Sequence, residues 1–280
     1  MRVIESKLVQ NFQIYLLQTE KSSNTIEKYM RDIQAFAAWC GAAEINKNLV
    51  LEYKMELLKK YASASVNSYI SSLNSFFEFC GWGDCKIKNV KIQKQIFANA
   101  EKELTKPEYE RLLRVAKCKK NRKVYYLIQT ICATGIRVSE LQYITAEAVW
   151  NGRATIDCKG KMRIVLLPKQ LCTMLRGYIK EHNIQSGAVF VTRTGKPLDR
   201  FAIWKALKSL CFAAGVAKDK VFPHNLRHLF ARTFYALEKD IVRLADILGH
   251  SSVNTTRIYT METGEIHYRQ IQRLGLLMRC

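Results

Sequence analysis

The sequence lacks the features that mark membrane-spanning and secreted proteins. Nowhere do about eighteen apolar residues run together, so no segment predicts a transmembrane helix. The N-terminal segment carries Glu5 and Gln10 among its apolar residues and has no signal-peptide core. We therefore expect a soluble, cytoplasmic protein.

Paired cysteines and metal-ligand spacings are also missing. The chain has nine cysteines but no C-x-x-C pair, and several of them lie in apolar stretches such as residues 127–133. This is typical of reduced, buried thiols. Cys80 and Cys85 form the one close pair, and no histidine stands at zinc-finger spacing from them. We therefore predict no metal site and no cofactor.

Acidic residues are scarce, with 24 Asp and Glu against 45 Lys and Arg and a net charge of +21 at pH 7. Residues 1–98 carry 13 basic and 9 acidic side chains, whereas residues 99–280 carry 32 and 15. A folded basic chain without long blocks of like charge indicates a polyanionic partner, most commonly nucleic acid. Charge alone leaves a solvated basic surface as an equally good explanation.

The chain is long enough for one large or two modest domains, and its 48% apolar content can form buried cores. Residues 1–95 have the apolar spacing of a small helical module. Phe36, Phe76 and Phe77 occupy apolar helix positions and are predicted to be core residues rather than base-stacking ones. The predicted helices begin near residues 3, 23, 47 and 63 and end near residues 16, 40, 60 and 79.

A second domain is predicted over residues 104–280, after a polar linker over residues 96–103. Thr105 and Glu108 read as a capping box at its first helix, with Pro107 in the first turn. The domain is predicted to be mainly α-helical with a small β-sheet. Helices are expected over residues 123–133, just after Arg137, and over residues 169–182, 201–214, 225–237 and 241–248.

The small sheet is predicted from an alternating segment after Gly152. Ala154, Ile156 and Cys158 alternate with polar residues, Lys159 and Gly160 read as a tight turn, and a partner strand follows over residues 162–167. The prediction is a β-hairpin with a lysine at its tip.

Four segments carry the residue types of a phosphate-handling site. They are TGIRVSEL at 134–141, CKGKMR at 158–163, PHNLRH at 223–228 and LGHSSVNTTRIYT at 248–260. Together they supply arginine, lysine, histidine and tyrosine, which are the groups needed to bind a phosphodiester, attack it and protonate the leaving oxygen. No metal ligand set is required for this chemistry.

These segments resemble the motifs of the tyrosine recombinase family, which includes phage integrases and Xer-type recombinases. The pattern L-G-H-S-S-x-x-T-T-x-x-Y, with His250 nine residues before Tyr259, is the most specific part. Residues 224–228 resemble the family's H-x-L-R-H box, and the order of the motifs also matches. The resemblance covers nearly the whole chain. It implies a two-domain DNA clamp, with a helical SAM-like core-binding domain and an α+β catalytic domain.

Within these motifs, Arg137 and Arg227 are the candidates for binding the non-bridging phosphate oxygens, because arginine forms bidentate hydrogen bonds and stays charged. Taken alone, Arg137 is explained as well by a salt bridge to Glu140 one turn away. In its motif, catalysis is the better explanation, and Glu140 then fits as a residue that orients a neighbour.

Tyr259 is the predicted nucleophile. A tyrosine hydroxyl is protonated near pH 7 and needs a base, for which His224 is the candidate. His250 is expected to hydrogen-bond the phosphate, and His228 is expected to support the fold around Arg227. Other tyrosines, such as those at 235 and 268, are not preceded by the L-G-H-x-x-x-x-T-T pattern.

Lys159 is the candidate acid for the 5′-oxygen of the leaving strand, because a lysine at a hairpin tip can reach into a groove. Lys161 stays an alternative, since C-K-G-K-M-R is one residue shorter than the family's G-K-G-x-K-x-R. Lys159 is preferred because it precedes the turn glycine, as in the family.

The sequence thus predicts a site-specific recombinase that cuts and rejoins DNA through a 3′-phosphotyrosyl intermediate, in integration, excision, inversion or dimer resolution. The predicted partners are double-stranded DNA with a specific recombination site and further protomers, which assemble into a tetramer on DNA. A type IB topoisomerase and a non-enzymatic DNA-binding protein are the alternatives. The tail over residues 260–280, with a short helix over residues 262–272, is expected to dock into a neighbouring protomer or, alternatively, onto its own domain.

Overall fold

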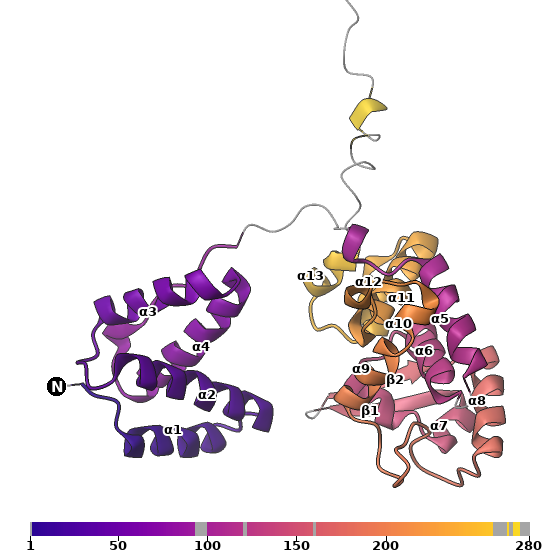
Figure 1. The fold of residues 1–280 in the computed structure, drawn as a ribbon, viewed down its shortest axis with the longest axis horizontal. Helices are drawn as coiled ribbons and strands as arrows, with labels where there is room; N and C mark the ends of the chain where they lie inside the picture. The colour runs from indigo at the N-terminus through magenta and orange to yellow at the C-terminus, as the bar shows by residue number, and fades with distance from the viewer. Residues whose placement is uncertain are drawn as a thin grey trace, which may run out of the picture. The chain divides into compact units, whose positions relative to one another are not determined.

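The computed structural model describes residues 2–92, 100–119, 122–158, 161–259, 268 and 271–274. The chain divides into two compact units, Met1–Lys94 and Gln95–Cys280 (Figure 1). The tail helix predicted over residues 262–272 lies largely outside the described residues. No helix among the described residues is long and apolar enough to cross a bilayer.

The first unit is a bundle of four helices, as the apolar spacing predicts. They are α1 (Ser6–Gln18), α2 (Ser23–Cys40), α3 (Lys47–Lys60) and α4 (Ser63–Phe79), followed by the 3₁₀ turn η1 (Gly83–Cys85). Phe36, Phe76 and Phe77 are fully buried among the helices, which confirms them as core residues. A buried carboxylate, Asp32, is ion-paired with Lys28 and accepts a hydrogen bond from Ser72 at 2.7 Å.

The second unit is mainly helical with one β-hairpin. Its α-helices are α5 (Lys106–Cys118), α6 (Lys123–Thr134), α7 (Ala146–Asn151), α8 (Lys169–Glu181), α9 (Arg200–Lys208), α10 (Cys211–Ala214), α11 (Pro223–Glu238), α12 (Ile241–Leu248) and α13 (Val253–Thr256). Its 3₁₀ turns are η2 (Ala100–Lys102), η3 (Val138–Tyr143), η4 (Lys218–Lys220) and η5 (Arg257–Tyr259). Helix α6 packs against α5, α8 and α11 and so lies at the centre of this unit.

Helix α5 begins at the predicted capping box. The Thr105 hydroxyl accepts from the Glu108 backbone N–H at 3.3 Å, and the Glu108 carboxylate accepts from the Thr105 backbone N–H at 2.8 Å. These two bonds satisfy backbone donors that the first helical turn leaves without partners.

The predicted hairpin is present as β1 (Arg153–Cys158) and β2 (Lys161–Leu166), which pair antiparallel from Arg153↔Leu166 to Cys158↔Lys161. Ala154, Ile156 and Val165 are buried, so one face of the hairpin covers the core. By the two-residue alternation of a strand, Arg163 shares this inward face with Val165. A charged residue on a core-facing position requires partners there.

One secondary-structure prediction is wrong. The helix expected over residues 201–214 is two helices, α9 and α10, separated by Ser209 and Leu210. The Ser209 hydroxyl bonds back to the Ala206 carbonyl at 2.8 Å and also meets the Lys119 ammonium at 2.9 Å, and such side-chain bonds compete with helix continuation. The short helix expected after Arg137 is present as the 3₁₀ helix η3, whose start is closed by the Glu140 carboxylate.

Candidate active site

Two helix ends frame the candidate site. Gly135 directly follows helix α6 and Gly249 directly follows helix α12, both with left-handed backbones (φ +62° and +63°). A Cβ on Gly135 would lie 2.5 Å from the Phe230 ring, and one on Gly249 would lie 2.5 Å from Cδ of Arg163. Glycine is therefore required at both turns by backbone conformation and by space.

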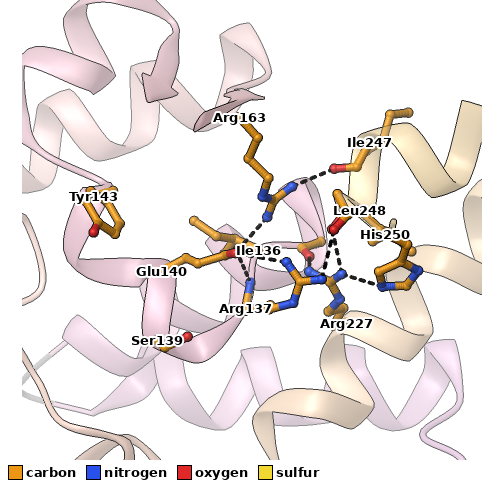
Figure 2. Close-up of polar contacts among 12 residues, drawn as sticks. Ile136, Arg137, Ser139, Glu140, Tyr143, Arg163, Arg227, Ile247, Leu248 and His250 are labelled. Atoms are coloured by element: carbon orange, nitrogen blue, oxygen red, sulfur yellow. Dashed lines mark hydrogen bonds and ion pairs between the residues drawn. The ribbon is translucent and has the colours of Figure 1, made fainter. Parts of the chain in front are cut away.

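Three arginines donate to the carbonyls at these helix ends (Figure 2). Arg227 binds the carbonyl of Gly135 at 2.6 Å and that of Leu248 at 2.8 Å. Arg163 donates to the carbonyl of Ile247 at 2.8 Å, and Arg137 donates to that of Gly249 at 3.1 Å. The carbonyls of Ile247, Leu248 and Gly249 all lie at the end of α12. Helix C-termini carry partial negative charge, so they stabilise the guanidinium groups.

Glu140 is the carboxylate shared by two of these arginines. It is 3% exposed, and its two oxygens accept from Arg137 Nη1 at 2.9 Å and from Arg163 Nη2 at 2.5 Å (Figure 2). The Arg137 backbone N–H donates to it as well, at 2.9 Å. Burial alone raises the pKa of Glu140, but the bonds from Arg163 and Arg137 outweigh burial and hold the pKa below its ordinary value.

The ion pair expected as the alternative explanation for Arg137 is thus present. It does not remove Arg137 from the site, because the side chain remains 39% exposed and lines a cavity of about 400 Å³. Residues with polar side chains in that lining are Arg137, Ser139, Arg200, Trp204, His224 and Arg227. Three arginines and no acidic residue in the lining suit the cavity to an anion.

Arg227 is the most buried of these cations, at 2% exposure. Burial and the neighbouring Arg137 lower the pKa of Arg227 to about 10, although the interaction with the Tyr259 hydroxyl opposes the shift. The guanidinium is still charged near pH 7. Its charge is therefore only partly compensated, which favours an anion beside Arg137 and Arg227.

His250 is held between Arg227 and Thr256. Its Nε2 lies 2.9 Å from Arg227 Nη2 and its Nδ1 lies 2.8 Å from the Thr256 hydroxyl. Burial, followed by Arg227 and Arg137, lowers the pKa of His250 to about 4, so the ring is neutral. Arginine can only donate, so Nε2 is the acceptor and Nδ1 carries the hydrogen. The phosphate hydrogen bond expected of His250 stays a prediction, because Nε2 is occupied by Arg227 here.

Tyr259 lies in η5 and is 3% exposed, packed with Ala231, Leu244 and Leu248. Its ring is stacked on His250 with centroids 6.0 Å apart and meets the edge of His228 at 4.6 Å. The motifs around Arg137, Arg227, His250 and Tyr259 thus converge in space. His224 lies at the cavity and is linked to His228 by a 3.0 Å contact between Nε2 atoms.

Lys159 and Lys161 are the two candidates for the general acid that protonates the 5′-oxygen. Lys159 lies outside the described residues, and of Lys161 only the backbone at the start of β2 is described. The choice between the two lysines therefore stays a prediction. Among the described residues, no group of three or more His, Cys, Asp or Glu side chains is placed to hold a metal ion.

Sequence reasoning missed the part played by Arg163. Its side chain joins β2 to Glu140 and to the end of α12, and its Cδ packs against the Gly249 turn. The signal was present in the strand pattern, because Arg163 interrupts the apolar face that Ile156 and Val165 form. A cation at a core-facing strand position indicates a buried partner.

Two family models match the chain: the phage integrase family over residues 102–265, and the phage integrase N-terminal SAM-like domain over residues 9–82. The chain belongs to the phage integrase family. Tyrosine recombinase XerA of Thermococcus kodakarensis is 30% identical over 98% of this chain and 96% of its own length. Tyrosine recombinase XerA of Pyrococcus furiosus is 28% identical over 99% and 96%.

Solved structures of this family share the fold. XerH site-specific recombinase bound to its difH substrate has a TM-score of 0.68, with 21% identity over 97% of this chain and 90% of that one. A lambda integrase dimer bound to a core site has a TM-score of 0.75, with 16% identity over 93% and 96%. The predicted family, the mainly α fold with a small sheet, and the class of tyrosine-type site-specific recombinase are confirmed.

Replacing Glu140 tests how far the arginines depend on it. Glu140→Gln keeps the shape but leaves Arg137 and Arg163 without their shared negative charge, so DNA cleavage is expected to slow at least about tenfold. The measurement is the single-turnover rate of covalent protein–DNA adduct formation. Glu147→Gln, an exposed carboxylate on α7, is the matched control and should leave the rate unchanged.

An unchanged rate for Glu140→Gln would show that the carboxylate does not position the arginines.

The contribution of Glu140 to stability depends on pH with a defined sign. Because the folded-state pKa of Glu140 lies below its ordinary value, its stabilisation is present at neutral pH and is lost as pH falls through the folded pKa.

Proposed function

We propose that the protein cuts and rejoins duplex DNA at a specific recombination site through a 3′-phosphotyrosyl intermediate. The observation that carries this proposal is the convergence of three separate motifs: Arg137 and Arg227 line one cavity, and Tyr259 interacts with Arg227. A phosphodiester resists attack because its oxygens are negative, and Arg137 and Arg227 offset that charge with fixed donors.

In the proposed reaction, the Tyr259 oxygen attacks phosphorus and forms a Tyr–O–P bond while the P–O5′ bond breaks. His224 accepts the Tyr259 proton, and Lys159 gives a proton to the departing 5′-oxygen. His250 orients Arg227 and the phosphate. Rejoining reverses each step, with the proton returning from His224 to Tyr259. One phosphodiester is exchanged for another, so no nucleotide cofactor is needed.

The proposed partner is double-stranded DNA. Relatives of known structure support this, since XerH is described with its difH substrate and lambda integrase with a core site. The excess of basic residues in residues 99–280 supplies affinity for phosphates, while base contacts and DNA shape select the site. We place the protein in the cytoplasm, where it meets the chromosome.

We further propose a division of labour between residues 1–95 as a core-binding domain and residues 104–280 as the catalytic domain, joined by the linker at 96–103. The match of the SAM-like model to residues 9–82 supports this assignment. On DNA, four protomers would assemble on two sites and exchange strands in pairs, with the tail over residues 260–280 reaching a neighbour.

Tyr259→Phe removes the attacking oxygen but keeps the ring that packs against His228 and His250. We expect DNA affinity to change little and covalent attachment to disappear. The assay measures a protein–DNA adduct that survives denaturation, formed on a nicked duplex that carries the recombination site. The sequence of the site is taken from inverted repeats near the gene or is selected from a random pool by the wild-type protein. An adduct formed by the variant would place the nucleophile at another residue.

A bridging 5′-phosphorothiolate distinguishes the two candidate acids, because its sulfur leaves without protonation. Lys159→Ala should cleave natural DNA at least about 10²-fold more slowly than wild type and should recover on the phosphorothiolate. Arg137→Ala, which removes charge stabilisation, should not recover. Recovery of Lys161→Ala in place of Lys159→Ala would move the acid to Lys161.

Deletion of residues 265–280 tests the assembly. The truncated protein should bind one half-site with ordinary affinity, but it should lose cooperative occupancy of a full site and nearly all recombination. Native gel shifts on half-sites and full sites measure the half-site affinity and the cooperative occupancy. Normal cooperativity and recombination would exclude an exchanged tail, whereas failure to fold would favour a tail packed on its own domain.

A further inference from the structure

Helix α11 carries a pair of histidines in direct contact. His224 and His228 stand one turn apart, with their Nε2 atoms 3.0 Å apart and their ring centroids 4.5 Å apart at 73°. His224 is exposed and lines the cavity with Arg137 and Arg227. His228 is half-buried, and its ring lies nearly perpendicular (82°) to the Tyr259 ring, with the two centroids 4.6 Å apart. His228 therefore contacts both the candidate base and the candidate nucleophile.

Desolvation and nearby charges keep the pair neutral. The cavity wall partly desolvates the exposed His224 ring, and this effect, followed by the charges of Arg227, Arg137 and Arg200, lowers the pKa of His224. Burial, followed by His224, Arg232 and Arg227, lowers the pKa of His228 to about 4. Two neutral imidazoles whose Nε2 atoms are hydrogen-bonded share one proton, so one ring donates and the other accepts.

The direction of that bond decides what His224 can do. If His228 donates, His224 accepts at Nε2, and its own hydrogen sits on Nδ1. His224 then has no unprotonated ring nitrogen left to accept a proton. If His224 donates from Nε2, its Nδ1 has a free lone pair and can take a proton. Base catalysis by His224 therefore requires His228 to be the acceptor.

We propose that His228 is the positioning residue for His224: it accepts the Nε2–H of His224 and so keeps His224 Nδ1 free to take the proton of Tyr259. This inference rests on the proposed function, because the role of His224 as base belongs to it. When Nδ1 takes the proton, His224 becomes a cation, and its Nε2–H bond to His228 strengthens because charged donors bind more tightly. The proton returns to Tyr259 on rejoining, so none leaves the site.

The contact with Tyr259 gives this arrangement a further consequence. The His228 ring contacts both the Tyr259 ring and the His224 ring. The orientation of His224 therefore depends on the position of Tyr259. A displaced Tyr259 would leave the His228 ring less well oriented, and His224 would lose orientation with it.

The test uses two variants that separate shape from hydrogen bonding. His228→Phe keeps an aromatic edge for Tyr259 but has no acceptor, whereas His228→Gln keeps an acceptor oxygen. Single-turnover adduct formation by the full chain is measured from pH 5.5 to 8.5 on the nicked site duplex. We expect His228→Phe to lose about tenfold or more across this range and His228→Gln to retain most of the rate. DNA affinity should be unchanged in both.

A double variant provides the decisive comparison. Because His228 acts through His224, adding His228→Phe to His224→Ala should cause no further loss. A further loss of about tenfold would overturn the proposal and show that His228 acts on Tyr259 directly or only supports packing. A wild-type rate in His228→Phe alone, or equal losses in the Phe and Gln variants, would overturn it too.

His182→Leu is the matched control, since this histidine contacts Tyr178 one turn away on α8, outside the site. It should not alter cleavage at any pH. The two levels of inference are distinguishable. If the wild-type protein formed no adduct on any duplex, the proposed function would fail and this inference with it. If the wild type reacts and His228→Phe matches it, the inference alone fails.

Discussion

The rest of the site depends on one constraint, which is that three positively charged arginine side chains lie in a small volume. Arg137 and Arg163 pair with one buried carboxylate, Glu140, and Arg227 lies close enough for that charge to act on it, so one negative charge faces three positive ones. Carbonyls at the ends of α6 and α12 stabilise the remainder. The left-handed glycine turns follow from this requirement, because they end each helix where its last carbonyls can face a guanidinium.

The same excess of charge also acts on the histidines of the site. Burial, with the nearby positive charges added to it, lowers the pKa of His224, His228 and His250, so the neutral form of each ring is favoured at neutral pH. In the proposed reaction, a bound phosphate would offset the arginines, so the pKa of His224 would rise and the proposed base would be stronger with substrate in place.

The sequence was sufficient for the motifs and most helices, because helix starts and apolar spacing are local signals. Helix α3 and helix α4 match their predicted ranges, and the capping box at Thr105 and Glu108 forms as expected. Long-range contacts were not predictable in the same way. The bond between Arg227 and His250 and the ion pair of Arg163 with Glu140 join residues 23 positions apart in each case, and the break at Ser209 depends on Lys119.

The spacing of each motif follows from the element that carries it. His224, Arg227 and His228 lie on one α-helix, where each residue adds about 100° of rotation. Losing one residue between His224 and Arg227 would turn the guanidinium away from the carbonyls of Gly135 and Leu248. The hairpin has no such constraint, because its register is fixed by strand pairing from Arg153↔Leu166 to Cys158↔Lys161. This pairing holds Arg163 on the inward face beside Glu140, so strand register sets the position of this arginine, whereas helix rotation sets that of Arg227.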